Sequence, residues 1–260
     1  MSAKDIIVKP ISSADAARIV KACHYSGKVV QNSQLHFGVF LNGRCGGAMQ
    51  FGPSLDKRKI QGLVEGTGWN GFLELNRMAF ADWLPRNSES RAIAVAMRLI
   101  RKAYPHIEWV ISFADGTQCG DGTIYRASGF VLTGITENST IWEFPDGERV
   151  SNIAIKTGHQ FQVRKFGKVM FGEEGMKQAR KVGARPVPGF QLRYIYFLNP
   201  AARSRLTVPV LPFSEIQRRG AGMYKGQPIK RGDSMGGHAP GIQPGEGGST
   251  PTSPLHSSDA

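Results

Sequence analysis

The segment that most constrains how this 260-residue chain folds is residues 111–130, ISFADGTQCGDGTIYRASGF. Residues 109–113 form an apolar run that predicts a strand buried on both faces, and Asp115 follows at its end. A polar, glycine-rich loop comes next, and then a short helix with Tyr125 placed four residues before Gly129-Phe130. A strand, a loop and a helix in this order predict an open α/β sheet, whose ligands bind at the carboxyl ends of the strands.

The first 145 residues alternate between strand and helix patterns. Asn42-Gly43, a dipeptide typical of tight hairpin turns, joins two expected strands at 35–41 and 47–51. Ile93, Met97 and Ile100 recur at helical spacing and predict an amphipathic helix over 88–104. The other expected strands are 5–8, 72–80, 109–113, 131–135 and 140–144, and the other expected helices are 13–22 and 124–127. The fold class is therefore α/β, a mixed central sheet flanked by helices, with a β-bulge at Arg77-Met78 where strand 72–80 loses its alternation.

The composition changes after about residue 150. Residues 156–205 interleave basic side chains with phenylalanines, and they include an expected helix at 173–181 and an aromatic strand at 192–198. From about residue 218 Gly, Pro, Ser and Thr dominate, and such a segment buries too little apolar surface to offset its ordering entropy. We therefore predict a core over residues 1–150, a basic aromatic-rich extension that packs on the core over 151–217, and a disordered tail over 218–260.

The net charge is the second strong constraint. A formal charge of +13 favours a polyanionic partner, most commonly nucleic acid, and the alternative is a basic tail that only aids solubility.

Three cysteines at no metal-ligand spacing suit a reducing cytoplasm better than a disulfide scaffold. The chain has no apolar run of the roughly 20 residues that a membrane span needs, and its start lacks the apolar centre of a signal peptide. We expect a cytoplasmic protein without a membrane partner.

The start of the helix at 88–104 is a candidate anion site. Amide groups and the helix dipole favour an anion there, Arg86 precedes the helix, and Ser88 and Ser90 add hydroxyl donors. Glu89 and Arg91 stand where glycines would let the backbone approach a pyrophosphate, and Glu89 would repel it. A capped helix with a solvated charged face explains these residues nearly as well.

Charged side chains inside the apolar strand 72–80 must be paired or functional, because burying them alone is costly. Arg77, at the expected bulge, either pairs with Glu74 or clamps an anion or a carboxamide oxygen.

A second group of polar residues is expected at the open end of the sheet. Asp115 ends the central strand, and His24 and Tyr25 follow the first helix, so the three would converge there. Such a trio would position an adenine amine, act as a general base, or bind iron or another divalent metal, although no metal-spacing motif supports the last reading. A histidine at a helix C-terminus more often only complements the helix dipole.

Tyr125 is a further candidate. Its phenol, with an ordinary pKa of about 10, is suited to act as a general acid, and the alternative is that Tyr125 is only a packed surface residue.

Several separated blocks of the sequence resemble known families. The strand, loop and Tyr-x-x-x-Gly-Phe helix are similar to those of acyl-CoA-dependent N-acyltransferases of the GNAT superfamily. CHYSGK (23–28), LHFGVF (35–40), ELNRMAF (74–80), the helix start at 88–90 and ISFADG with IYRASGF (111–130) together resemble, over about residues 20–197, the phage Mom family of DNA-modification proteins. The resemblance implies a divergent GNAT-like fold that converts adenine in DNA to N6-carbamoylmethyladenine, which protects phage DNA from host restriction.

The resemblance also implies roles for particular residues. It places Arg77 and Ser90 where the family binds its cofactor or donor, and His24, Tyr25 and Asp115 in the catalytic centre; Tyr125 is carried over from the wider superfamily. The expected catalytic residues are thus His24, Tyr25, Arg77, Asp115 and Tyr125, and the expected cofactor-binding residues are Arg77, Arg86, Ser88 and Ser90. Because the pyrophosphate glycines are missing, Asp115 is a better candidate for the chemistry than Tyr125.

The expected partners are double-stranded DNA, contacted by the 151–217 extension, and a small-molecule donor, acetyl-CoA or a related acyl compound, in the cytoplasm of a host cell. Iron as a cofactor and a homodimer as the assembly are left open. The alternative functions are a small-molecule or protein N-acetyltransferase that uses acetyl-CoA, and a non-catalytic DNA-binding protein of the same fold.

Overall fold

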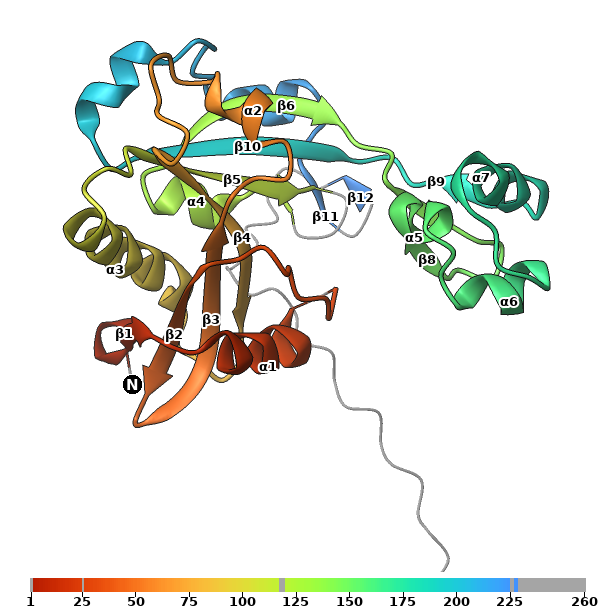
Figure 1. Cartoon of the computed structure of the whole chain (residues 1–260), viewed down its shortest axis with the longest axis horizontal. Coiled ribbons are helices and arrows are strands. Elements are labelled where there is room, and N and C mark those ends of the chain that lie inside the picture. Colours follow the sequence, from red (N-terminus) through yellow and green to blue (C-terminus); the bar gives the residue numbers. More distant parts are fainter. Residues whose placement is uncertain (1, 25, 117–119, 225–226, 229–260) are drawn as a thin grey trace, which may run out of the picture.

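The computed structural model describes residues 2–24, 26–116, 120–224 and 227–228 of the chain (Figure 1). Its centre is a seven-stranded mixed sheet in the order β1-β2-β3-β4-β5-β10-β6. Only β4 and β5 are parallel; the other neighbours in this sheet are antiparallel. The strands are β1 Ile7–Pro10, β2 Leu35–Leu41, β3 Arg44–Gly52, β4 Phe72–Phe80, β5 Trp109–Asp115, β6 Val131–Glu137 and β10 Phe190–Phe197. The α/β fold class that the sequence predicted is confirmed.

Helices cover both faces of this sheet (Figure 1). Helix α1 (Ser13–Cys23) packs against β2, β3 and β4, and this side of the sheet is called the α1 face. Helix α2 (Lys57–Gln61) and its connections lie on the same face, where Val64 packs with Phe72 and Trp109 in one apolar cluster. Helix α3 (Ser88–Ala103) covers the opposite face, called the α3 face, and helix α4 (Thr123–Ala127) contacts it there.

Local sequence explains these elements well. In α3 the predicted apolar stripe of Ile93, Met97 and Ile100 is buried in the main core, while Arg91 and Arg98 are exposed. Asn42 and Gly43 both have a positive φ, 51° and 78°, as a two-residue hairpin turn between twisted strands requires.

A β-bulge in β4 marks the place where the sheet opens. Leu75 lies opposite Phe51 and Arg77 lies opposite Gln50, so the extra residue is Asn76, just before the bulge position that the sequence predicted. Pairing between β4 and β5 covers only residues 72–74 of β4, although β4 continues to Phe80. The two strands therefore part at the bulge.

Residues 138–189 form a small unit of their own between β6 and β10 (Figure 1). Its three-stranded sheet has the order β8-β7-β9 and its core includes Trp142, Phe144 and Ile155. Its elements are β7 Ile141–Glu143, β8 Arg149–Ser151, α5 Asn152–Lys156, α6 Phe161–Phe166, α7 Gly172–Lys181 and β9 Arg185–Pro186. We call this unit the insertion.

The insertion changes two expectations from the sequence. The strand expected at 140–144 pairs within the insertion and does not join the central sheet. The central sheet also extends beyond residue 150, because β10 lies between β5 and β6. Because these strands are far apart in the chain, no local sequence pattern shows where the central sheet ends and the insertion begins.

The chain after β10 packs back on the sheet. The remaining elements are η1 Ala3–Asp5, η2 Pro200–Arg205, α8 Ser214–Arg218, β11 Met223–Tyr224 and β12 Gln227–Pro228. Since β11 and β12 pair with each other, the tail expected to be disordered from residue 218 begins with some regular structure. Residues 229–260 of that expected tail lie outside the described residues. Within the described part of the chain, no helix has the length and apolar character that crossing a membrane requires.

The insertion should be dispensable for folding of the sheet. Its two ends are adjacent, because the Asn138 amide donates to the Gly189 carbonyl at 2.8 Å. Replacing residues 139–188 with an Asn-Gly turn would convert β6 and β10 into an ordinary hairpin. We expect cooperative thermal unfolding with a Tm within about 5 °C of the full chain, measured by circular dichroism. Non-cooperative melting of the shortened protein would contradict this.

Candidate active site

The candidate site lies on the α1 face, where β4 and β5 part. Alternate residues of a strand share a face, so Glu74, opposite Ile111, projects on the side of the α1-face apolar cluster. Arg77, opposite Gln50, also projects there because of the bulge. Asp115 occupies the corresponding side of β5, two residues beyond Phe113. The structure thus brings Glu74, Arg77 and Asp115 to one face, around the gap between the two strands.

Polar side chains from three strands and two loops gather at the bulge. Gln50 Nε2 lies 3.3 Å from His36 Nδ1, the Ser33 hydroxyl donates to Asn76 Oδ1 at 3.1 Å, and Asn32 Nδ2 donates to the Pro53 carbonyl at 2.8 Å. We call this group the polar cluster; its members are Asn32, Ser33, His36, Gln50, Ser54, Glu74, Asn76 and Arg77.

Part of the polar cluster is buried without being satisfied. Asn32 Oδ1, Gln50 Oε1 and Ser54 Oγ have no hydrogen-bond partner among the described residues, and Gln50 is fully buried. Each such atom costs on the order of 1–3 kcal/mol, so proteins keep few of them. Three in one place indicate a site that water or a ligand completes.

Glu74 is the carboxylate at the centre of the polar cluster. Burial raises its pKa above the ordinary value, and the nearby Ser54 hydroxyl, Asn76 and Arg77 oppose the rise. Ser54 lies close enough to affect the carboxylate, although its hydroxyl oxygen does not reach hydrogen-bond geometry. A carboxylate with a raised pKa is better matched to proton transfer near neutral pH than an exposed one.

His24 ends α1 beside this cluster. Its Nδ1 accepts from the Ser26 amide at 3.1 Å and lies 2.8 Å from the Ser26 hydroxyl. A backbone N–H can only donate, so Nδ1 is unprotonated and the proton of the neutral ring is on Nε2. Burial and, to a smaller extent, the Arg77 charge lower the pKa of His24 to about 4. In its neutral form His24 therefore carries its N–H at Nε2.

Arg77 joins the loop after α1 to the bulge. Its Nε donates to the Lys28 carbonyl at 3.2 Å, and its Nη1 donates to the Asn76 carbonyl at 2.8 Å. These bonds use two of the five N–H groups of the guanidinium. Arg77 thus holds the 24–28 loop in place and brings a positive charge to the polar cluster. Tyr25, in the same loop, lies outside the described residues.

Tyr125 lies on the opposite side of the sheet from His24, Arg77 and Asp115. Its ring packs against Phe130 and Tyr194, with ring centroids 5.3 Å apart in both pairs, in the main core under α3. The expected catalytic residues are therefore divided between the two faces of the sheet.

At the helix start that was expected to bind a pyrophosphate, the hydroxyls of Ser88 and Ser90 already form hydrogen bonds within the protein. Ser88 Oγ donates to the Pro85 carbonyl at 2.6 Å, and Ser90 Oγ donates to the Asn87 carbonyl at 3.2 Å. Arg86 is exposed, and Glu89 is buried in the first turn. The two hydroxyls therefore serve the turn itself, as does the Ser88 amide, which donates to the Pro85 carbonyl at 3.1 Å.

The described residues form no metal-binding site of the kind that iron requires. No group of three or more His, Cys, Asp or Glu side chains is placed there to hold a metal ion. We therefore assign no ligands to the iron that was left open.

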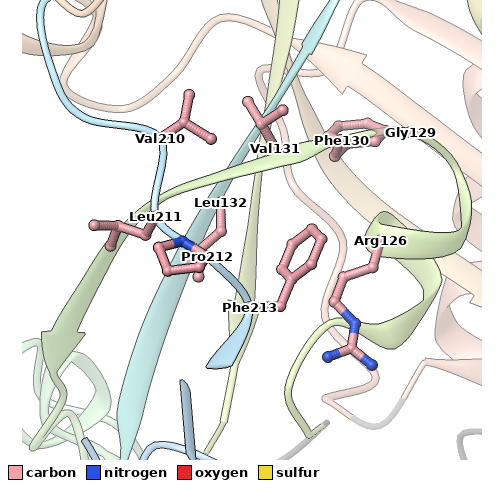
Figure 2. Close-up of a pocket in the computed structure, with 9 residues that line it drawn as sticks. All are labelled: Arg126, Gly129, Phe130, Val131, Leu132, Val210, Leu211, Pro212 and Phe213. Atoms are coloured by element: carbon pink, nitrogen blue, oxygen red, sulfur yellow. The ribbon is translucent and has the colours of Figure 1, made fainter. Parts of the chain in front are cut away.

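A hollow elsewhere on the molecule has a different character. Figure 2 shows it between α4, β6 and residues 210–213, with a volume of about 540 Å³. Its lining is apolar except for Arg126, whose guanidinium lies 5.3 Å from the ring centroid of Phe213. It offers no group for proton transfer, so the polar cluster is the better candidate for chemistry.

Sequence reasoning missed the buried partners of the site. Glu74 and Arg77 stood out as charges in an apolar strand, but Asn32, Gln50 and Ser54 are ordinary polar residues of a loop, a strand and a second loop. Only the pairing of β2, β3 and β4 brings them together.

Solved structures that resemble the fold are acetyltransferases. One is the ribosomal-protein-S18-alanine N-acetyltransferase from Escherichia coli, with a TM-score of 0.40, 10% identity, and coverage of 75% of this chain and 94% of that chain. Another is a GNAT family acetyltransferase from Elizabethkingia anophelis with acetyl-CoA bound, with a TM-score of 0.38, 12% identity, and coverage of 74% and 98%.

The sequence comparisons identify the family. The model of the Mom protein family matches residues 5–215. The chain is also 42% identical over 208 residues to the methylcarbamoylase mom of Escherichia phage Mu, covering 78% of this chain and 80% of the relative. The chain belongs to the Mom protein family.

The pKa of His24 predicts how stability depends on pH. Between about pH 6.5 and about pH 4 the unfolded chain binds a proton at this residue and the folded chain does not, so the free energy of unfolding falls as the pH falls. In His24→Asn this contribution is absent. Allowing for partial solvent screening, we expect the wild type to lose about 2 kcal/mol more than the variant over this range in urea titrations. Parallel pH profiles for the two proteins would contradict the buried, neutral histidine.

Proposed function

We propose that this chain is a transferase that converts adenine in DNA to N6-carbamoylmethyladenine, an activity of the kind for which its phage Mu relative is named. The observation that carries the proposal is the incompletely satisfied polar cluster at the gap between β4 and β5, in a chain of the Mom family. The cluster offers a carboxylate, a cation and amide groups to a flat, polar acceptor such as adenine.

The acceptor chemistry requires a base. The N6 amine of adenine is weakly nucleophilic because its lone pair is delocalised into the ring, so a proton must leave as the new bond forms. Glu74 and Asp115 both lie on this face, and the raised pKa of Glu74 favours it as the acceptor of that proton. Neutral His24 supplies a hydrogen bond from Nε2 to the ring or the donor, and Arg77 attracts a carboxamide oxygen.

The donor is proposed to be an acyl-CoA-type compound. Beyond Glu74 the described residues of β4 form no backbone ladder with β5, and an extended chain adds readily to a strand edge that lacks a partner strand. The first turn of α3, with exposed Arg86 beside it, favours the negative charge of a pyrophosphate. The product bond joins N6 to a methylene carbon, whereas an acetyl transfer would join N6 to a carbonyl carbon. The donor must therefore present a methylene carbon that carries a leaving group, so that as the N6–carbon bond forms the bond to the leaving group breaks, its electron pair departs with the leaving group, and the N6 proton passes to the carboxylate.

The DNA must be opened for this reaction. N6 of a paired adenine is hydrogen-bonded inside the duplex, so the enzyme would extrude the base or act at a local opening. The net charge of +13 supplies attraction to phosphates without sequence preference. The host cytoplasm is where such a phage enzyme would meet its DNA.

Mass spectrometry of nucleosides from cells that express the protein tests the proposal. We expect carbamoylmethyladenine with the wild type and a decrease of at least about 100-fold with Arg77→Ala, Asp115→Asn or Glu74→Gln, because a base or an anchoring cation is lost. Arg18→Ala, at an exposed pair on the outer side of α1, is the matched control and should retain the product.

The same experiment separates the alternatives. N6-acetyladenine is lighter than the expected product by the mass of NH, so its appearance would identify an acetyl transfer. Labelled acetyl on an amine other than DNA would favour the small-molecule or protein acetyltransferase. Unmodified nucleosides together with salt-sensitive DNA binding would favour the non-catalytic protein.

Gln50 distinguishes a functional polar group from a structural one. Replacing it with Met removes a buried, unsatisfied amide oxygen at nearly constant volume. We expect the free energy of unfolding to stay level or rise by about 1 kcal/mol while the modified nucleoside decreases. Urea denaturation and nucleoside analysis of the same variant check both parts. A loss of stability with the modification unchanged would show that Gln50 only supports the sheet.

A further inference from the structure

Leu55 is the most exposed large apolar side chain among the described residues, with 93% of its surface accessible. It directly follows Ser54, a buried member of the polar cluster, so its backbone lies about 3.8 Å from that of a residue at the site. Resting on the proposed function, we propose that Leu55 is a wedge that enters the DNA stack in place of the adenine that is extruded into the polar cluster.

The loop that carries Leu55 is held on both sides of it. Before it, the Pro53 carbonyl accepts from Asn32 Nδ2 at 2.8 Å and from Asn76 Nδ2 at 3.5 Å. After it, the Asp56 carboxylate accepts from the Lys59 amide at 3.4 Å and caps α2. The loop is therefore fixed to the polar cluster and to α2, while the leucine itself projects into solvent.

The surroundings of Leu55 suit a phosphate backbone. Lys57, Arg58 and Lys59 follow it in succession, and none of them makes an ion pair with a carboxylate of the described chain. Lys57 donates to Asn70 Oδ1 at 3.0 Å and lies 4.5 Å from the ring centroid of Trp69, which is itself 54% exposed. Cations beside an exposed apolar group bind phosphates while the apolar group reaches the bases.

Leucine has the right chemistry for this task. Extruding a base leaves a gap in the stack, and apolar side chains fill such gaps without reading the sequence, because they offer no hydrogen bonds. A lone exposed leucine elsewhere on a surface needs no explanation. Here the exposed side chain, the fixed loop and the cations without ion pairs to described carboxylates occur in one segment of 17 residues, 53–69, which also carries Ser54 of the polar cluster.

The wedge is tested by comparing paired with unpaired adenine. Purified protein is incubated with cell extract as the donor source and either duplex DNA or single-stranded DNA of the same sequence. We expect Leu55→Ala to modify the duplex at least about 10-fold less than the wild type, because it cannot hold the opened stack, and to modify the single strand within about 2-fold of the wild type. Leu55→Met, which keeps the apolar volume, should restore activity on the duplex.

Two controls keep the test decisive. Ile7→Ala removes another exposed apolar residue, 63% accessible in β1 and remote from the polar cluster, and should act on both DNA forms as the wild type does. Thermal unfolding should be unchanged in Leu55→Ala because the side chain is exposed. Equal losses on the two DNA forms, or full activity on the duplex, would overturn the wedge.

Failure of the transferase proposal is distinguishable from failure of the wedge. If the wild type modifies neither DNA form, the proposed function fails, and the wedge is still tested by binding. A duplex that carries 2-aminopurine in place of adenine should gain fluorescence on binding the wild type, because its base leaves the stack, and gain much less with Leu55→Ala. Equal gains for the two proteins would overturn the wedge.

Discussion

The structure depends on the separation of β4 from β5 at Asn76. Three residue pairs join the strands, and then the bulge turns β4 away, although both strands continue. Where the ladder ends, side chains replace it in part, since the Leu75 carbonyl accepts from the Ser112 hydroxyl and the Asn76 carbonyl accepts from the Arg77 guanidinium. The same bulge turns Arg77 to the α1 face, beside His24 and Gln50. One extra residue thus creates both the separation of the strands and the group of polar side chains beside it.

The polar cluster shows how the fold retains groups that oppose its stability. Asn32 and Gln50 keep buried oxygens without partners, Glu74 has a raised pKa, and His24 has a lowered one. Each is unfavourable for folding, and together they suit an acceptor that brings its own hydrogen bonds. The apolar clusters under α2 and α3 supply the stability that makes this arrangement tolerable.

Much of the fold was predictable because its signals are local. The strands at 35–41 and 72–80 have the bounds that the sequence predicted, and the hairpin turn at Asn42-Gly43 follows from the φ that these residues tolerate. The bulge was placed one or two residues late, because alternation shows that a strand is interrupted and not which residue is extra. The position of β10 between β5 and β6 and the separate insertion could not be predicted from local sequence patterns. Both arise from pairing between segments that are far apart in the chain.

For the site, the sequence by itself determined the charged candidates and the family: Arg77 and Asp115 in or after apolar strands, His24 after the first helix, and blocks of residues in the Mom order. Only the tertiary structure decided which of them share a face. It separated Tyr125 from His24, set the tautomer of His24 through the Ser26 amide, and brought Gln50 and Ser54 to Glu74. The physical reason is that the neighbours of a side chain decide which face of the sheet it occupies, how deeply it is buried and where it carries its proton. Those neighbours come from other strands and loops that are distant in the sequence.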